Sequence, residues 1–366
     1  MATNNSPLSV AASRGLSLAL GAGNGIIGTV ADGQTITIAS DGVNGFGNVT
    51  PTTEFFSDFS EMTAGAELNS STPTVGSFYG NSPNLVKDTY SHGGSQCMDT
   101  LSGGVHKIAR IALPNSPNAI MVSYWTFIPS GKGMPAYEPD SFVVKSGISP
   151  SSWKIGWLST GDSTDQPDFG GSDGGDLCIP SNNGEDRWII GGNSTGNGFY
   201  QKDNYVQPSA ILTYGEWLWT WVLLDPDNNG LIKVRHLSKS KGFFEFSEAI
   251  DNSFWGTSAN QLWQFFNLSG YMRTGDALVD SEVYHDDLCI QGGPAAAVSV
   301  VIGDAPTLAS CSDLHTNIKT NSVSDTEFEA FIGKNPLASY SGNYLFVLDS
   351  QGNPVQYNGS DSRLIP

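Results

Sequence analysis

The stretch from Tyr214 to Leu237, YGEWLWTWVLLDPDNNGLIKVRHL, decides the fold class. Its first half alternates two sets of side chains, and each set lines one face because successive side chains of a strand point to opposite sides. Both sets are largely apolar, which is typical of a central strand covered on both faces. The run DPDNNG at 225–230 is a dense turn signal, and alternation resumes at Ile232 and Val234. The stretch predicts a hairpin in the middle of a large antiparallel sheet.

The composition extends this pattern to the whole chain of 366 residues. It contains 43 Gly and 19 Pro, and only 14% of its residues are charged, which favours many short strands joined by turns. The best helical candidate, Asn260 to Leu268 (NQLWQFFNL), fits a strand equally well. We therefore predict an all-β protein.

The charge balance limits the partners. A formal net charge of −19 argues against nucleic acid and against anionic lipid, because both are bound by clustered Lys and Arg. The first residues lack the order of a secretory signal, and Leu16 to Leu20 is too short for a membrane span. We expect the chain to stay in the cytoplasm unless an assembly carries it out.

The four cysteines, Cys97, Cys178, Cys289 and Cys311, lie far apart without a CxxC pair. This spacing suggests neither zinc nor a redox dithiol. Buried thiols are the simplest interpretation, and one disulfide is left open.

The N-terminal part divides into an arm and a strand-like region. Residues 1–24 are small, polar and Gly-rich, and we expect an extended arm that a partner orders. Residues 25–48 alternate around Ile36 and Ile38 after the turn at 32–33. The pattern resembles the opening of a TIG/IPT immunoglobulin-like domain, although Ala39 stands where a Gly is usual. The matching residues are Gly28, Gly33, Gln34, Thr35, Ile36, Thr37, Ile38, Gly45, Phe46 and Gly47.

The second half of such a domain is predicted at the other end of the chain. Residues 298–309, 322–331 and 342–352 resemble its later strands. One half cannot close a sandwich alone, because its strands would expose unpaired edges. We predict one discontinuous domain, 25–50 plus 295–360, with the strands near Ile38 and Val300 in one sheet. The alternative is two unrelated β-segments.

The intervening residues, 54–292, contain most of the aromatic residues. Their opening FFSDF at 55–59, the middle WKIGWL at 153–158 and the closing VYHDDL at 283–288 together resemble a concanavalin A-like (LamG-type) jelly roll. In that family the first and last strands are neighbours, which is also what an insertion requires.

The resemblance implies a glycan-binding face. Flat aromatic rings cover the apolar side of a sugar, and planar polar groups bind its hydroxyls. An alternative is that these aromatic residues are core, because large aromatics dominate the packing between sheets. The candidate glycan-binding residues are Trp153, Lys154, Trp157, Trp217, Trp219 and Trp221.

Related jelly rolls hold a structural calcium near their first and last strands, which implies Asp58 and Asp287 as candidate ligands. Adjacent carboxylates repel each other unless a cation or hydrogen bonds offset their charge. Turn-capping, solvated carboxylates are the alternative. The turn at 225–230 copies half of an EF-hand loop, but His236 stands where a bidentate Glu is required, so we interpret it as a hairpin turn.

No catalytic residues are predicted. The paired carboxylates of a retaining jelly-roll glycosidase do not occur along any strand-like run. A polysaccharide lyase needs a Tyr or His base and a neutralising side chain. Candidates of these types exist without forming a lyase signature: Tyr124, Tyr284, His106, His285 and Arg110.

These observations lead to three alternative functions. Tandem Ig-like and jelly-roll modules resemble those displayed on tailed-phage particles, so the first hypothesis is a non-enzymatic virion protein (a head decoration, head fibre or tail-fibre component). It would be anchored to other virion proteins through residues 1–24 and would bind glycan weakly. The second is a secreted polysaccharide lyase or glycoside hydrolase, and the third is a purely structural cement protein. A homo-oligomer is left open.

Overall fold

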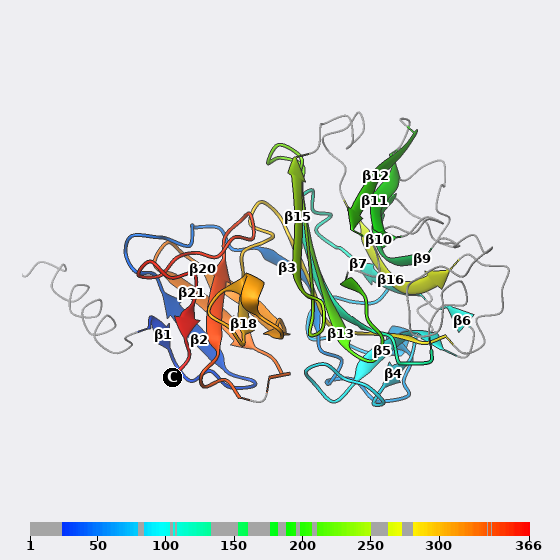
Figure 1. Cartoon of the computed structure of the whole chain (residues 1–366), viewed down its shortest axis with the longest axis horizontal. Helices are drawn as coiled ribbons and strands as arrows, with labels where there is room; N and C mark the ends of the chain where they lie inside the picture. Colours follow the sequence, from blue (N-terminus) through cyan, green and yellow to red (C-terminus); the bar gives the residue numbers. More distant parts are fainter. Residues whose placement is uncertain are drawn as a thin grey trace, which may run out of the picture.

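The protein is all-β and consists of two lobes that lie side by side (Figure 1). The large lobe comprises residues 52–292, and the small lobe comprises residues 24–51 and 293–366. Helical structure in the described part is limited to short turns such as η1 (Leu68–Ser70) and η2 (Leu308–Ser310). The computed structural model describes residues 24–79, 84–102, 105–106, 108–132, 153–159, 176–181, 188–194, 198–206, 211–249, 263–272, 281–334, 336–337 and 339–366.

The first sheet of the large lobe, here called the junction sheet, has its strands in the order β15-β14-β13-β8-β17-β5-β4, with β3 pairing with β17 and β6 with β5. All of its described pairings are antiparallel. Its strands are β3 (Thr52–Ser57), β4 (Val86–Lys87), β5 (Cys97–Ser102), β6 (Val105–His106), β8 (Ile120–Phe127), β13 (Trp217–Asp225), β14 (Leu231–Ser238), β15 (Gly242–Ala249) and β17 (Val283–Gly292).

The second sheet, the far sheet, runs in the order β12-β11-β10-β9-β16-β7. One face of the junction sheet packs against it in an apolar core that includes Val122, Leu224, Leu158 and Phe266. The far-sheet strands are β7 (Ile108–Ala112), β9 (Trp153–Ser159), β10 (Asp176–Ser181), β11 (Trp188–Ser194), β12 (Gly198–Val206) and β16 (Phe265–Met272). β16 settles the ambiguous segment at 260–268: its described part from Phe265 onward is a strand.

The predicted central hairpin is confirmed. β13 pairs with β14 from Leu218↔Ser238 to Asp225↔Leu231, and with β8 on its other side. The connection closes through left-handed backbone at Asn229 and Gly230. Eight of the nine residues of β13 are buried, because both faces of this strand are covered.

The small lobe is a sandwich of two sheets built from both ends of the chain. One sheet has the order β1-β2-β21-β20 and the other β19-β18-β22-β23, and both contribute to one apolar core. β2 pairs with β21 from Thr35↔Phe331 to Ala39↔Glu327. The strands are β1 (Ile26–Ile27), β2 (Thr35–Ala39), β18 (Ser299–Gly303), β19 (Leu314–His315), β20 (Ile318–Val323), β21 (Glu327–Ile332), β22 (Tyr344–Leu348) and β23 (Arg363–Leu364).

The expectation that the strands near Ile38 and Val300 share one sheet is wrong. Ile38 lies in β2 and Val300 in β18, which belong to the two facing sheets. Both side chains are nevertheless buried in the same core. The two segments therefore complete one sandwich across its interior instead of pairing along an edge.

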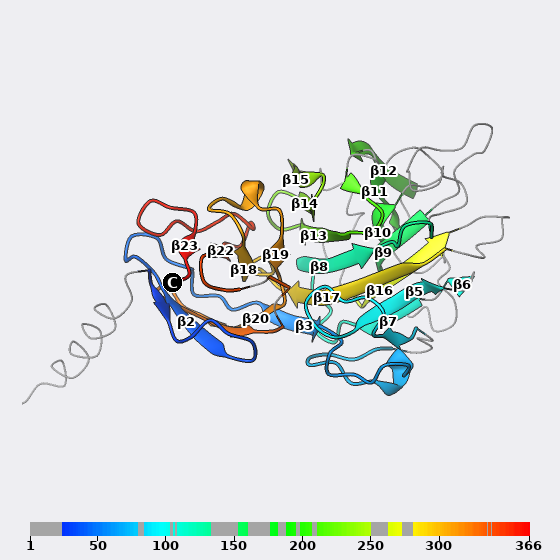
Figure 2. The same cartoon turned by 60° about the horizontal axis from the view of Figure 1, so that its bottom comes forward.

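The large lobe leaves and re-enters the small lobe through neighbouring strands. β3 pairs with β17 from Ser57↔Leu288 to Thr52↔Gly292, and Figure 2 shows the two strands side by side at the junction. The other face of the junction sheet packs against the small lobe, where Trp221 and Leu223 share an apolar cluster with Val301 and Phe346.

Three of the four cysteines, Cys97, Cys289 and Cys311, are buried free thiols, and the side chain of Cys178 lies outside the described part. Burial raises the pKa of Cys289 to about 12, which leaves its thiol protonated. Among the described residues, no helix has the length and apolar character needed to cross a membrane.

Candidate functional site

The tryptophans of β13 face the small lobe. Trp219 and Trp221 are 0% and 1% exposed, and both belong to the apolar cluster between the lobes. The indole N–H of Trp219 donates to Ser123 Oγ at 2.9 Å, and the ring of Trp221 packs against Gly352. These two rings have no open face on which a sugar could stack, so the row of same-face tryptophans is a junction core here. Trp217, at the start of the strand, is only half-buried.

The tryptophans of β9 are only partly described. Trp157 is 2% exposed and packs with Ile108, so it also lacks an open ring face. Trp153 and Lys154 lie in the same strand, but their side chains fall outside the described residues. A glycan-binding role of Trp153, Lys154 and Trp217 stays a prediction.

The carboxylates of Asp58 and Asp287 lie close together at the junction, because β3 and β17 are paired. Asp58 Oδ2 accepts a hydrogen bond from Asn317 Nδ2 at 2.8 Å. Asp287 Oδ2 lies 2.7 Å from His92 Nδ1. A side chain from each lobe thus offsets part of this negative charge.

The fit of calcium to this position is partial. Within the described part of the chain, no group of three or more His, Cys, Asp or Glu side chains is arranged to hold a metal ion. Two buried oxygens, Asp287 Oδ1 and Asn317 Oδ1, have no hydrogen-bond partner among the described residues. They are the hard oxygen donors that calcium prefers. Calcium at Asp58 and Asp287 therefore stays a prediction, with Asn317 as an added ligand.

His92, in the segment between β4 and β5, connects the two lobes. Its backbone N–H donates to Asp286 Oδ2 at 2.7 Å, and its ring stacks on Trp125 with centroids 3.6 Å apart. Its Nε2 lies 3.5 Å from Asp313 Oδ1 of the small lobe. Burial opposes the charge on the ring most strongly. The combined hydrogen bonds and charges of Asp287 and Asp313 outweigh it and raise the pKa of His92.

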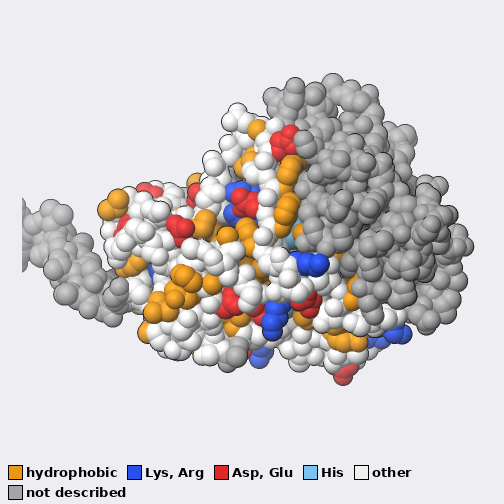
Figure 3. Space-filling model, in the orientation of Figure 1, with side chains coloured by type: hydrophobic (Ala, Val, Ile, Leu, Met, Phe, Trp, Pro, Cys, Tyr) orange, Lys and Arg blue, Asp and Glu red, His pale blue; other side chains and the backbone are white. Residues whose placement is uncertain are grey.

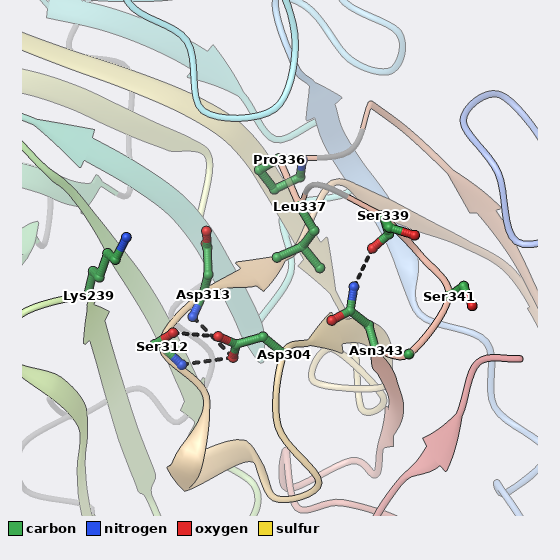
Figure 4. A pocket seen from close by; sticks show the side chains of 10 residues that line it. Lys239, Asp304, Ser312, Asp313, Pro336, Leu337, Ser339, Ser341 and Asn343 are labelled. Atoms are coloured by element: carbon green, nitrogen blue, oxygen red, sulfur yellow. Dashed lines mark hydrogen bonds between the residues drawn. The ribbon is translucent and has the colours of Figure 1, made fainter.

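A cleft of about 540 Å³ opens where Lys239 of the large lobe faces the small lobe (Figure 4). Lys239, from the β14–β15 turn, lies on one side, and Ser339, Ser341 and Asn343 of the small lobe lie on the other. Leu337 extends between these two groups in the close-up view. Asp304, Ser312, Asp313, Pro336 and Gly342 complete the lining.

Several side chains of the cleft are held in place by hydrogen bonds. Asp304 accepts from the backbone N–H of Ser312 at 2.8 Å and also from its hydroxyl. Asn343 Nδ2 donates to the backbone oxygen of Ser339. Through Asp313, the cleft wall reaches His92, whose ring centroid lies 5.7 Å from that of Trp217. The half-buried Trp217 therefore contacts the same buried histidine as the cleft residue Asp313 does.

Charged side chains gather along the middle of the face shown in Figure 3, where the lobes meet. Deeper in the junction, Arg235 pairs with Glu245 at 2.6 Å and lies over the ring of Trp221. Lys233 Nζ donates to Asn353 Oδ1 at 2.7 Å, across the lobes. The junction thus combines an apolar cluster with paired charges.

Those lyase candidates whose side chains the structure describes do not form an accessible site. Tyr124 and His285 are 1% and 0% exposed, and their rings face each other inside the sandwich at 5.8 Å. Tyr284 is 5% exposed and donates to Glu282 Oε2 at 2.7 Å. Burial is the largest cause that raises the pKa of Tyr284, followed by Glu282. Arg110 lies on β7 in the far sheet, and the side chain of His106 is outside the described residues.

Sequence reasoning missed His92, Asp313, Asn343 and Lys239. Each lies in a turn or loop without a periodic pattern, and the contacts of His92 reach residues 194 and 195 positions away. No local signal in the sequence could have shown them to converge.

A scan against protein-family models finds no match, and a search among characterised proteins finds none either. Solved structures do resemble the chain in outline. An alginate lyase from Aplysia kurodai has 8% identity and a TM-score of 0.41, with 57% of this chain and 87% of that one covered. The alginate lyase vAL-1 from Chlorella virus has 11% identity and a TM-score of 0.39, covering 60% and 93%. The lectin UEA-II has 8% identity and a TM-score of 0.35, covering 71% and 99%.

These similarities are low both in sequence identity and in TM-score. At such identities and TM-scores they carry no argument about activity. They give no support to the predicted TIG/IPT and phage-virion resemblances.

Proposed function

We propose that the protein binds glycan without cleaving it, and that the cleft between the lobes is the binding site. The observation that carries this proposal is the composition of the cleft wall. Hydroxyl, amide, carboxylate and ammonium groups surround two apolar side chains, Pro336 and Leu337.

This composition suits a polyhydroxylated ligand. A sugar offers hydroxyls that both donate and accept, so a wall with acceptors such as Asp313 and a donor such as Lys239 can satisfy them. The C–H surface of the ring needs an apolar contact, which Leu337 can supply. The volume of about 540 Å³ falls within the range of small-molecule sites.

The proposal excludes cleavage because of where the described acid–base candidates lie. A lyase base must reach a proton of the bound sugar directly or through one water. Tyr124 and His285 lie within the sandwich core, and Tyr284 is committed to Glu282. None of these three side chains lines the cleft.

Titration calorimetry with oligosaccharides of alginate, laminarin, agar and carrageenan tests the binding. We expect saturable binding to at least one of them, weakened about threefold to tenfold by Lys239→Ala and by Asn343→Ala. Lys241→Ala is the matched control, because Lys241 lies in the same β14–β15 turn but does not line the cleft. Unchanged affinity in both cleft variants would show that the glycan site lies outside this cleft.

Incubation with the same polysaccharides tests the second half of the proposal. We expect neither unsaturated nor reducing ends to accumulate. Their release by the protein would replace the binding function with a lyase or hydrolase function.

A further inference from the structure

The charges around the cleft restrict the glycans that it can accept. We propose that the cleft selects glycans without carboxylate or sulfate groups, and that an amine-bearing glycan binds more tightly than a neutral one. This inference rests on the proposed function and names the ligand class for the same site.

The negative charge of Asp304 is fixed in the cleft wall. Its carboxylate accepts from the backbone N–H groups of Ser312 and Asp313, and from the Ser312 hydroxyl. These donors on the protein hold the carboxylate in one orientation. A ligand carboxylate brought beside it would meet an immobile like charge.

Asp313 is the acceptor that remains open to a ligand. Its side chain is 45% exposed, so part of the carboxylate faces solvent. One oxygen, Oδ1, accepts from the backbone N–H of Leu314 at 2.9 Å and faces His92. An ionised carboxylate only accepts hydrogen bonds, so its partner must be a hydroxyl or an ammonium group.

The cleft offers little positive charge in return. Lys239 is the cation among its described lining residues. Glu216 lies against the same β14–β15 turn, where its carboxylate accepts from both the backbone N–H and the hydroxyl of Ser240. Three carboxylates, those of Asp304, Asp313 and Glu216, thus lie in or near the described cleft wall against the one ammonium of Lys239.

The rest of the molecule reinforces this local balance. The chain has 36 acidic and 17 basic residues, so a polyanion approaching the cleft is repelled at long range. A uronate or sulfate on every ring would multiply that repulsion along the chain. The same negative field attracts an amine-bearing sugar and has little effect on a neutral sugar.

Binding of three oligosaccharide series of equal length tests the inference: glucosamine oligomers, laminari-oligosaccharides and oligo-uronates. At low ionic strength we expect the glucosamine oligomers to bind most tightly, the laminari-oligosaccharides less tightly and the oligo-uronates most weakly. High salt should narrow the differences, because screening weakens exposed charge interactions. Asp313→Asn should reduce the preference for the amine over the neutral series about twofold to fivefold. Asp227→Asn, in the β13–β14 turn outside the cleft, should leave it unchanged.

The outcomes separate the two proposals. If none of the three series binds, the glycan-binding function fails and the charge selection fails with it. If uronates bind as tightly as neutral sugars at low salt, the selection is wrong while the glycan-binding function stands. A preference that persists in Asp313→Asn would also overturn the assignment to this cleft.

Discussion

The two faces of the junction sheet are buried for different purposes. The face toward the far sheet packs through one continuous apolar core that includes Val222, Leu224 and Val234, and its buried polar side chains are neutral groups such as Thr220, which is bonded to His236. The face toward the small lobe mixes large aromatic rings with buried charges such as Arg235 and Lys233. The first composition is typical of a core that folds as one unit, and the second resembles an interface between domains. Neighbouring residues of one strand thus serve folding and lobe docking separately.

Two adjacent leucines give the largest and most direct test of this difference. Leu224 points into the sandwich core and Leu223 into the junction, and both are at most 1% exposed. Truncation of either to alanine should cost about 2–5 kcal/mol, because each leaves a cavity. Leu224→Ala should lower the unfolding midpoint of the large lobe. Leu223→Ala should instead produce a separate, earlier transition as the lobes undock. Calorimetry of both variants measures these transitions. Identical single transitions would show that the two faces belong to one cooperatively unfolding core.

Breaking one charge pair of the junction should have a smaller effect. Glu245→Gln leaves the Arg235 guanidinium, whose side chain is 3% exposed, without its 2.6 Å carboxylate partner. We expect a loss of about 1–3 kcal/mol in the free energy of unfolding, measured by denaturant titration. Ser247→Ala, an exposed change on the same strand, should stay within about 0.5 kcal/mol of the parent. Equal effects of the two substitutions would show that the pair contributes nothing.

Two buried histidines, His236 on the core face and His92 at the junction, should respond to pH with opposite signs. Burial lowers the pKa of His236, on the core face, to about 3, so this ring stabilises the fold while neutral. Its contribution is fully present above the unfolded value near 6.5 and is lost as the pH falls through the folded value. The pKa of His92, at the junction, is raised. Its contribution is therefore fully present below about pH 6.5 and is lost as the pH rises through its folded value.

The free energy of unfolding, measured in EDTA, should change by up to about 1.4 kcal/mol per pH unit for each histidine within its window. His236→Gln should flatten the acid limb, and His92→Gln should flatten the alkaline limb. A single variant that flattens both limbs would contradict the separation of the two faces.

Calcium should have the smallest effect. At about ten times its Kd it would raise the free energy of unfolding by about 1.4 kcal/mol at most. This increase should be smaller near neutral pH than at alkaline pH, because a proton on His92 competes with calcium for the Asp287 carboxylate. Asp287→Asn should abolish the increase, and thermal unfolding with calcium or with EDTA measures it. If calcium leaves the unfolding midpoint of the parent protein unchanged, the assignment of calcium to Asp58 and Asp287 is wrong.

Local pattern was sufficient for the all-β class and for the central hairpin, because alternation and turn residues are short-range signals. The same alternation placed Trp217, Trp219 and Trp221 on one face, but it carries no information about what covers that face. Here the small lobe covers it, and it does so through residues more than 70 positions further along the chain. The cleft depends on the same long-range docking, which is why Asp313 and Asn343 could not be inferred from their neighbours in sequence.

The pairing of Thr52 with Gly292 has a consequence for how this protein could change over generations. The two crossing points of the large lobe are adjacent residues in space, so a short turn could join them after deletion of everything between. The remaining sandwich would keep its own hydrophobic interior but would expose the patch around Phe346. A single in-frame insertion could therefore convert a one-lobe ancestor into this two-lobe molecule, and a single in-frame deletion could reverse the step. Neither event would change the order of the strands in the remaining sandwich.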